Sequence, residues 1–127
     1  MAKKRKLNEA EWEIMEGVWH FDRPVTVREV HEVLYPQKQK AYTTVQTIMN
    51  ILTDKGFLQR EKRGKVNFYT PTLSRQDAAR METQNLVSRL FQGSFGALAN
   101  YLINSGQLTE KDLQDIKALL DKKDRDA

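Results

Sequence analysis

The pattern of apolar and polar positions along the chain predicts six helices and one β-hairpin. In six segments, apolar residues recur every three or four positions, which is the spacing of helices that bury one face. These segments run over about residues 8–21, 26–36, 43–55, 74–92, 95–105 and 109–120. Residues 58–62 and 66–69 instead alternate as strands do, and Arg63-Gly64-Lys65 between them is typical of a hairpin turn. The predicted fold class is therefore mostly α with a small β-hairpin.

Most of the predicted helices begin with a capping pair, in which a polar residue precedes its partner by three positions. The pairs are Asn8 with Glu11, Thr26 with Glu29, Ser74 with Asp77 and Thr109 with Asp112. The first residue can accept a hydrogen bond from the backbone N–H of the second, whose side chain can bond back. By the same rule we expect Thr43 to cap the third helix with Gln46 as its partner. Gly56 is expected to end that helix, because glycine readily adopts a left-handed conformation.

The first two helices are expected to supply much of the core. On the first helix, Trp12, Met15 and Trp19 share a face with Ile14 and Val18. On the second helix, the expected buried face consists of Val27, Val30, Val33 and Leu34.

The third helix and the hairpin predict a DNA-binding site. The helix buries Val45, Ile48, Met49 and Leu52 on one side and carries short polar side chains on the other. A polar-faced helix followed by a hairpin with a cationic tip is the layout of a winged helix-turn-helix, whose helix enters the major groove and whose wing touches the backbone. The residues expected to contact DNA are Thr43, Thr44, Gln46, Thr47 and Asn50 on the helix, and Arg60, Lys62, Arg63 and Lys65 in and beside the wing.

The charge distribution agrees with a polyanionic partner for this part of the chain. The net charge is +4; residues 1–73 carry 13 Lys and Arg against 9 Asp and Glu, whereas residues 74–127 carry 8 of each. An excess confined to one module favours a nucleic-acid partner at that module. The alternative, a generically basic surface, would spread its charge more evenly. The basic arm Met1–Lys6 is expected to be disordered.

The last three helices predict an interface with a second copy of the chain. A module of about 50 residues is marginal unless it covers more apolar surface than it can bury alone. The expected homodimer interface consists of Leu90, Phe91, Phe95, Leu98, Leu102, Leu113, Ile116 and Leu120. The alternative is that these helices fold back on the first module.

No catalytic residue, metal site or cofactor is expected. The chain has no cysteine, which excludes disulfides and thiolate metal sites, and it has no phosphate-binding glycine loop or nucleophilic serine motif. His20 and His31 have no partner at ligand spacing, so both are interpreted as structural or solvent-facing. No apolar run approaches the ~20 residues of a membrane span. A cytoplasmic protein that is not an enzyme is the resulting expectation.

Taken in order, these segments resemble the BlaI/MecI penicillinase-repressor family of bacterial transcriptional regulators over nearly the whole chain. The matching stretches are LNEAEWEIMEGVW, TTVQTIMNILTDKGFL, KVNFYTP and LFQGSFGALANYLINSGQLTEKDLQDIKALL. The resemblance implies an N-terminal winged helix-turn-helix over residues 1–73 and a C-terminal three-helix dimerisation domain over 74–127. It also implies repression by a homodimer on a double-stranded, inverted-repeat DNA operator.

The resemblance further implies a mode of release. In that family a membrane sensor-transducer with a zinc metalloprotease domain responds to β-lactam, and the repressor is then cleaved between an Asn and a Phe in its dimerisation domain. The matching position here is Asn100-Tyr101, so the family implies cleavage there and a link to antibiotic resistance. The alternative is that both are ordinary interface residues. Characterised members often carry a basic residue where this chain has Ile51, so the operator is expected to differ.

Two other functions also fit the pattern. The winged helix can be a protein-interaction module whose polar helix face docks a partner. Alternatively, the chain can be a regulator that a small ligand releases from DNA by binding between the two modules.

Overall fold

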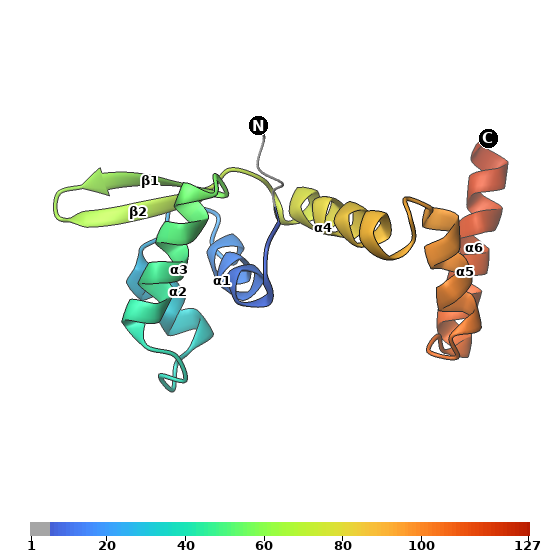
Figure 1. Cartoon of the computed structure of the whole chain (residues 1–127), viewed down its shortest axis with the longest axis horizontal. Helices are drawn as coiled ribbons and strands as arrows, with labels where there is room; N and C mark the ends of the chain where they lie inside the picture. Colours follow the sequence, from blue (N-terminus) through green and yellow to red (C-terminus); the bar gives the residue numbers. More distant parts are fainter. Residues whose placement is uncertain (1–5) are drawn as a thin grey trace. The chain divides into compact units, whose positions relative to one another are not determined.

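The computed structural model describes residues 6–127 and contains six helices and one two-stranded antiparallel sheet in that range (Figure 1). Nearly all of the expected basic arm lies outside these residues. The elements in order are α1 (Glu9–Trp19), α2 (Val27–Leu34), α3 (Tyr42–Asp54), β1 (Leu58–Arg63), β2 (Val66–Pro71), α4 (Arg75–Leu90), α5 (Phe95–Asn104) and α6 (Glu110–Asp126). The order of helices and strands predicted from the sequence is confirmed.

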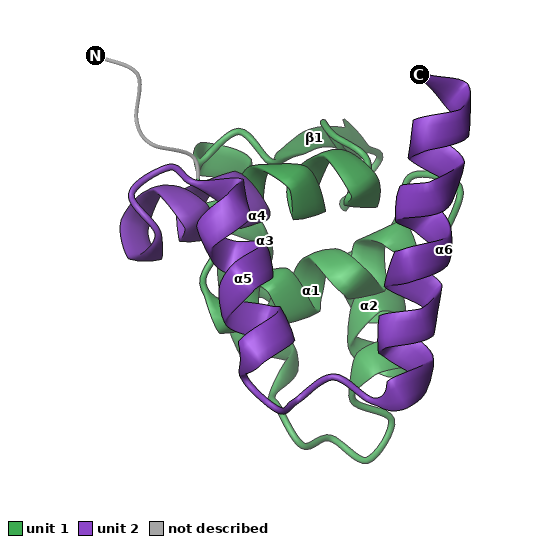
Figure 2. Cartoon of the chain, turned by 90° about the vertical axis from the view of Figure 1, so that its right-hand side faces the viewer, with its two compact units in different colours: residues 1–82 green, residues 83–127 purple. Residues whose placement is uncertain are grey.

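The chain divides into two compact units, residues 1–82 and 83–127, and the division falls within α4 (Figure 2). The first turns of α4 belong to the first unit. Ala78 is fully buried there, and Met81 packs against the core. The Leu7 backbone N–H donates to the Glu82 carboxylate at 2.8 Å, which ties the chain before α1 to this part of α4.

The predicted capping pairs form at four of the helix starts. Full capping boxes stand at α1 (Asn8 and Glu11), α2 (Thr26 and Glu29) and α6 (Thr109 and Asp112), and at α4 Ser74 Oγ accepts from the Asp77 N–H at 3.0 Å. The prediction for α3 was wrong. That helix begins one residue before Thr43, its N-cap is Ala41, and no side chain caps it.

The core of the first unit lies between α1, α2, α3 and the base of the hairpin. Its fully buried members include Ile14, Met15, Val18, Val30, Val45, Met49, Leu52, Phe57 and Tyr69. Trp12 and Trp19 are partly buried at its edge, with their rings 5.4 Å apart. The prediction that Val33 is buried was wrong, because it is 38% exposed. Val27, Val30 and Leu34 lie along one side of α2, and Val33 is turned away from that side by the 3.6-residue period.

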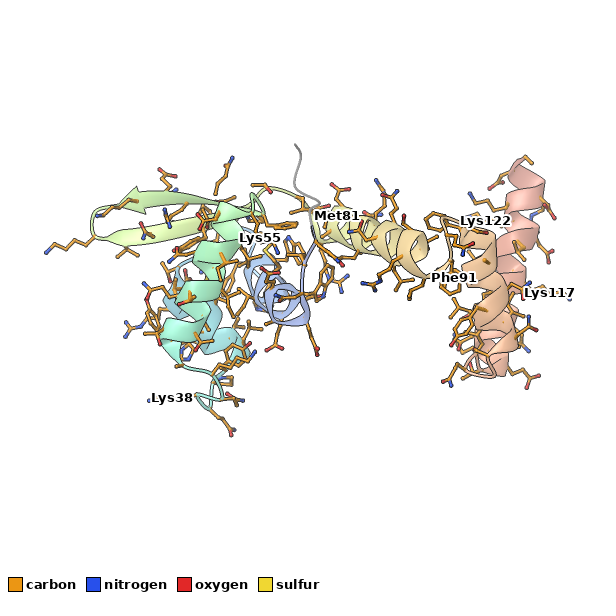
Figure 3. All side chains as sticks on the ribbon, viewed as in Figure 1. Lys38, Lys55, Met81, Phe91, Lys117 and Lys122 are labelled. Carbon is orange, nitrogen blue, oxygen red and sulfur yellow. The ribbon has the colours of Figure 1, made fainter. Side chains whose placement is uncertain are left out.

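A buried carboxylate joins α1 to the end of α3. Glu11 is 4% exposed, and its carboxylate accepts from the Asn8 N–H at 2.9 Å and from Lys55 Nζ at 2.8 and 3.0 Å. Lys55 also donates to the Lys6 carbonyl at 2.7 Å (Figure 3). Gly56 follows with φ of +86°, and the helix ends there as predicted.

The hairpin is longer than predicted and its turn is shorter. Arg63 pairs with Val66 as part of the ladder, so the turn consists of Gly64 and Lys65 alone. Gly64 has φ of +65°, which explains a glycine at this position. Val25 and Tyr69 exchange backbone hydrogen bonds of 2.7 and 3.0 Å, which anchor β2 to the segment before α2.

The second unit buries very little within a single chain. Among its residues only Val87 is buried. Figure 2 shows α5 and α6 diverging from the turn that joins them. At the end of α4, the Phe91 ring lies 5.8 Å from that of Tyr101 on α5 (Figure 3). No helix within residues 6–127 has both the length and the apolar character needed to cross a bilayer.

Candidate nucleic-acid interface

The outer face of α3 consists of the polar residues that the sequence predicted. Thr43, Thr44, Gln46 and Thr47 are exposed, whereas Val45, Met49 and Leu52 on the opposite side are fully buried. Because side chains three and four positions apart share a helix face, these polar residues lie together on the exposed side of α3. The hairpin lies beside this helix (Figure 1).

Asn50 differs from these residues because its side chain is already engaged. Arg60 Nη1 donates to Asn50 Oδ1 at 2.8 Å, and the Tyr69 hydroxyl donates to the same oxygen at 2.9 Å. We call Asn50, Arg60 and Tyr69 the Asn50 clasp; it connects α3 to both strands of the hairpin.

The clasp changes what Asn50 can offer to a base. A bidentate contact with adenine needs a carboxamide oxygen that accepts and an NH2 that donates. The two lone pairs of Asn50 Oδ1 are both occupied, so only the NH2 group remains. Gln46 is exposed, and its side chain makes no hydrogen bond within residues 6–127. Gln46 is therefore the side-chain amide on α3 that is suited to an adenine.

Three of the four predicted wing cations lie on the two faces of the hairpin, and the fourth lies at its turn. Alternation along β1 puts Arg60 and Lys62 on the face of Tyr69, and Arg63 on the opposite face with Glu61. Arg63 lies over the Phe68 ring at 4.9 Å, and its Nη2 is 3.4 Å from the Glu61 carboxylate. Lys65 is exposed at the turn. Arg60 and Arg63 are thus partly engaged within the protein, whereas Lys62 and Lys65 have no ion pair in the described part of the chain.

A groove between α3 and the wing adds residues that the sequence did not indicate. It has a volume of about 740 Å³, and its lining includes Arg28, Tyr42, Gln46, Lys65 and Phe68. Arg28 comes from the first turn of α2, where nothing in the spacing distinguishes it from a solvated charge. Only packing of α2 against α3 brings this cation to the groove that contains Gln46.

The two histidines lie in different surroundings. His31 Nε2 donates to the Lys40 carbonyl at 2.8 Å and so holds the connection between α2 and α3, and His20 is exposed. Residues 6–127 contain no group of His, Asp and Glu that could bind a metal ion.

The residues predicted for cleavage lie in the middle of α5. Asn100 and Tyr101 are both exposed, and Tyr101 retains 60% of its surface. The Asn104 side-chain NH2 donates to the Asn100 carbonyl at 3.0 Å. Both side chains are thus accessible to solvent, but the bond between the residues is held in helical conformation.

The residues predicted for the dimer interface are mostly uncovered. Leu90, Phe95, Leu102, Leu113 and Leu120 are 40–60% exposed, whereas Phe91, Leu98 and Ile116 are half-buried. The sequence did not single out Ile103 and Leu119, which are 51% and 63% exposed. The second unit therefore carries many exposed apolar side chains.

Comparison with known proteins gives consistent matches along nearly the whole chain. A family model described as Penicillinase repressor matches residues 7–122. The methicillin resistance regulatory protein MecI of Staphylococcus aureus (strain N315) is 24% identical over 121 residues, which cover 95% of this chain and 98% of that protein. The penicillinase repressor of Bacillus licheniformis is also 24% identical over 121 residues, covering 95% of this chain and 94% of the relative.

A solved structure resembles part of the chain. The solution structure of the DNA-binding domain of the repressor BlaI matches with a TM-score of 0.52 and 31% sequence identity. The match covers 61% of this chain and 93% of that one.

Proposed function

The chain belongs to the penicillinase repressor family of DNA-binding transcriptional repressors, and from that premise we propose that it acts as a homodimer on an inverted-repeat operator. Members of this family are transcriptional regulators and not enzymes. One observation carries the proposal: a polar helix face beside a cationic hairpin occurs in the same chain as a second unit with uncovered apolar side chains. Residues 1–73 form the DNA-binding domain and residues 74–127 the dimerisation domain.

DNA binding rests on α3 and the wing. In this proposal α3 enters the major groove with Thr43, Thr44, Gln46 and Thr47 toward the bases and Asn50 at its wing side. The cations that contact phosphates are Arg60, Lys62, Arg63 and Lys65. Phosphate contacts supply much of the affinity and make it fall with salt, whereas base contacts decide which sequence is bound.

Dimerisation rests on the exposed apolar surface of the second unit. Phe95, Leu102 and Leu113 are 53%, 40% and 43% exposed, and we infer that they contribute to an apolar interaction site, because large exposed apolar patches mark such sites. A second copy presents the same surface, so a two-fold contact can cover both. Two DNA-binding domains related by a two-fold axis match an inverted repeat. Loss of the second half-site lowers operator affinity by roughly 10²–10⁴-fold through effective concentration.

Release rests on cleavage between Asn100 and Tyr101 by a membrane sensor-transducer metalloprotease. Both residues are exposed, but they lie inside a regular helix, and proteolysis acts on locally opened chain. α5 has ten residues and none of them is buried within a single chain, so its opening breaks few contacts inside the chain and is opposed mainly by the proposed dimer contact. Cleavage there separates the half of α5 that carries Leu102 from the DNA-binding domain and thereby weakens the dimer.

The dimer is tested with Leu102→Asp. A buried, unpaired carboxylate at an apolar contact is costly, so the variant is expected to sediment as a monomer and to bind an operator at least ten-fold more weakly. Gln114→Asp on the exposed surface of α6 is the matched control. The dimer proposal would be overturned if the wild type sediments as a monomer at micromolar concentration and Leu102→Asp binds the operator as tightly as the wild type does.

Cleavage is tested separately by the intact mass of the protein recovered from cells after induction. Fragments ending at Asn100 and beginning at Tyr101 are expected. Release from DNA with only full-length protein present would instead favour a small ligand as the inducer.

A further inference from the structure

The recognition helix α3 has no basic residue. Between Tyr42 and Asp54 its only formal charge is that of Asp54, at the C-terminal end. The commonest specific contact in the major groove pairs Arg or Lys with guanine, and α3 cannot make it. Recognition by this helix must use hydroxyl, amide and methyl groups.

Ile51 is the large aliphatic side chain of α3 that is exposed. Ile51 is 43% exposed, whereas Val45, Met49 and Leu52 are fully buried. It lies four residues after Thr47 and seven after Thr44, and both threonines are exposed. These spacings put the three residues on one side of a helix. They form a strip of methyl-bearing side chains, which we call the methyl strip (Thr44, Thr47 and Ile51).

The methyl strip lies on the other flank of α3 from the Asn50 clasp. Asn50 and Ile51 are neighbours in sequence, so their side chains are about 100° apart around the helix. Asn50 is directed to Arg60 and Tyr69 of the hairpin by hydrogen bonds of 2.8 and 2.9 Å. The hairpin therefore does not cover the methyl strip. When α3 lies in the major groove of DNA, the strip can contact the base edges on the floor of that groove.

Building on the proposed DNA binding, we propose that the methyl strip recognises thymine methyl groups and that Ile51 is a specificity-determining residue. Thymine is the base that presents a methyl group in the major groove, and apolar side chains and threonine methyls are its usual partners. The side-chain amide of Gln46 is not part of the Asn50 clasp, so it can form a bidentate contact with an adenine. Both chemistries select A·T base pairs, so the part of the half-site under α3 consists of them.

The experiment removes the methyl groups alone. Full-length protein selects its preferred duplexes from a randomised library, and each thymine in the selected half-site is then replaced in turn by deoxyuridine. Wild-type affinity is expected to fall about four-fold for each contacted methyl group, which corresponds to the burial of one such group. Ile51→Ala is expected to bind the thymine and deoxyuridine duplexes equally at the position that Ile51 contacts. Val33→Ala, which trims another exposed apolar residue, should keep the full discrimination.

The outcomes separate this inference from the proposed function. If selected duplexes bind in preference to random DNA but no deoxyuridine changes their affinity, the methyl strip is not a thymine contact and the repressor function stands. If Ile51→Ala retains the wild-type discrimination at every position, Ile51 is not the determinant. If no sequence preference emerges at all, both proposals fail, and a protein partner for the exposed face of α3 becomes the better explanation.

Discussion

The Asn50 clasp predicts a specific non-additivity between two substitutions. Tyr69 is 1% exposed, and its hydroxyl donates to Asn50 Oδ1 at 2.9 Å. Tyr69→Phe removes one hydrogen bond and leaves Arg60 on the amide oxygen, so it should cost about 1 kcal/mol. Asn50→Leu leaves the Tyr69 hydroxyl unpaired near the core, which should cost about 1–3 kcal/mol. In the double variant neither group is left unpaired.

The free energy of unfolding lost in the double variant is therefore expected to be smaller than the sum of the two single losses. The expected difference is about 0.5–1.5 kcal/mol. Both tryptophans of the chain, Trp12 and Trp19, lie in the first unit. Urea unfolding followed by tryptophan fluorescence thus reports on the unit that contains the clasp. Additivity of the two substitutions within about 0.3 kcal/mol would refute the clasp as an energetic element.

The same variants test whether Asn50 positions the wing or contacts bases. As a positioning residue, Asn50→Leu should weaken binding to selected and to random duplexes by the same factor. Gln46→Ala should instead reduce the preference for the selected duplex. A loss of preference at a single adenine in Asn50→Leu would show direct base contact.

Three further predictions concern other parts of the molecule. Hydrogen bonds from Arg75 lower the pKa of the Glu16 carboxyl below its usual 4.5. This carboxylate therefore contributes stability that is present above about pH 4.5 and is lost as the pH falls through the lowered pKa. Glu16→Gln should flatten the acid side of the profile of unfolding free energy against pH, measured by tryptophan fluorescence. A Cβ at Gly17 would lie 2.7 Å from Leu34 Cδ1, so Gly17→Ala should lower the free energy of unfolding in urea by about 1–3 kcal/mol. Lys65→Ala at the hairpin turn should weaken binding to all DNA and reduce the slope of log affinity against log salt by about one, whereas Lys117→Ala on α6 should leave the slope unchanged.

Local chemistry in the sequence was enough to predict the elements. Capping at Asn8, Thr26 and Thr109 depends on partners three residues away, and the helical and strand periods depend on neighbours along the same segment. The exposed polar face of α3 followed from the same periodicity. The failure at Thr43 also has a local reason: α3 begins one residue earlier, so Thr43 lies inside the helix and Ala41 is the N-cap. The Ala41 carbonyl accepts from the N–H groups of Thr44 and Val45.

Long-range partners could not be predicted in this way. Asn50 was grouped with the base-contacting residues because its position on α3 is right, but its hydrogen-bond donors are 10 and 19 residues away. Arg28 joins the groove beside Gln46 from another helix. The buried Glu11 carboxylate meets Lys55 across 44 residues. No spacing rule connects such residues, because their proximity arises only when helices and hairpin pack.

The amino-acid sequence by itself thus determined the order of helices and strands, the buried side of α1 and α3, and the family of the protein. Tertiary structure alone decided which polar groups on those surfaces remain available to a partner. The physical reason is that hydrogen-bond capacity is finite: the oxygen of Asn50 that accepts from Arg60 and Tyr69 cannot also accept from a base. Gln46 and the methyl strip are available for recognition because packing left them without such partners.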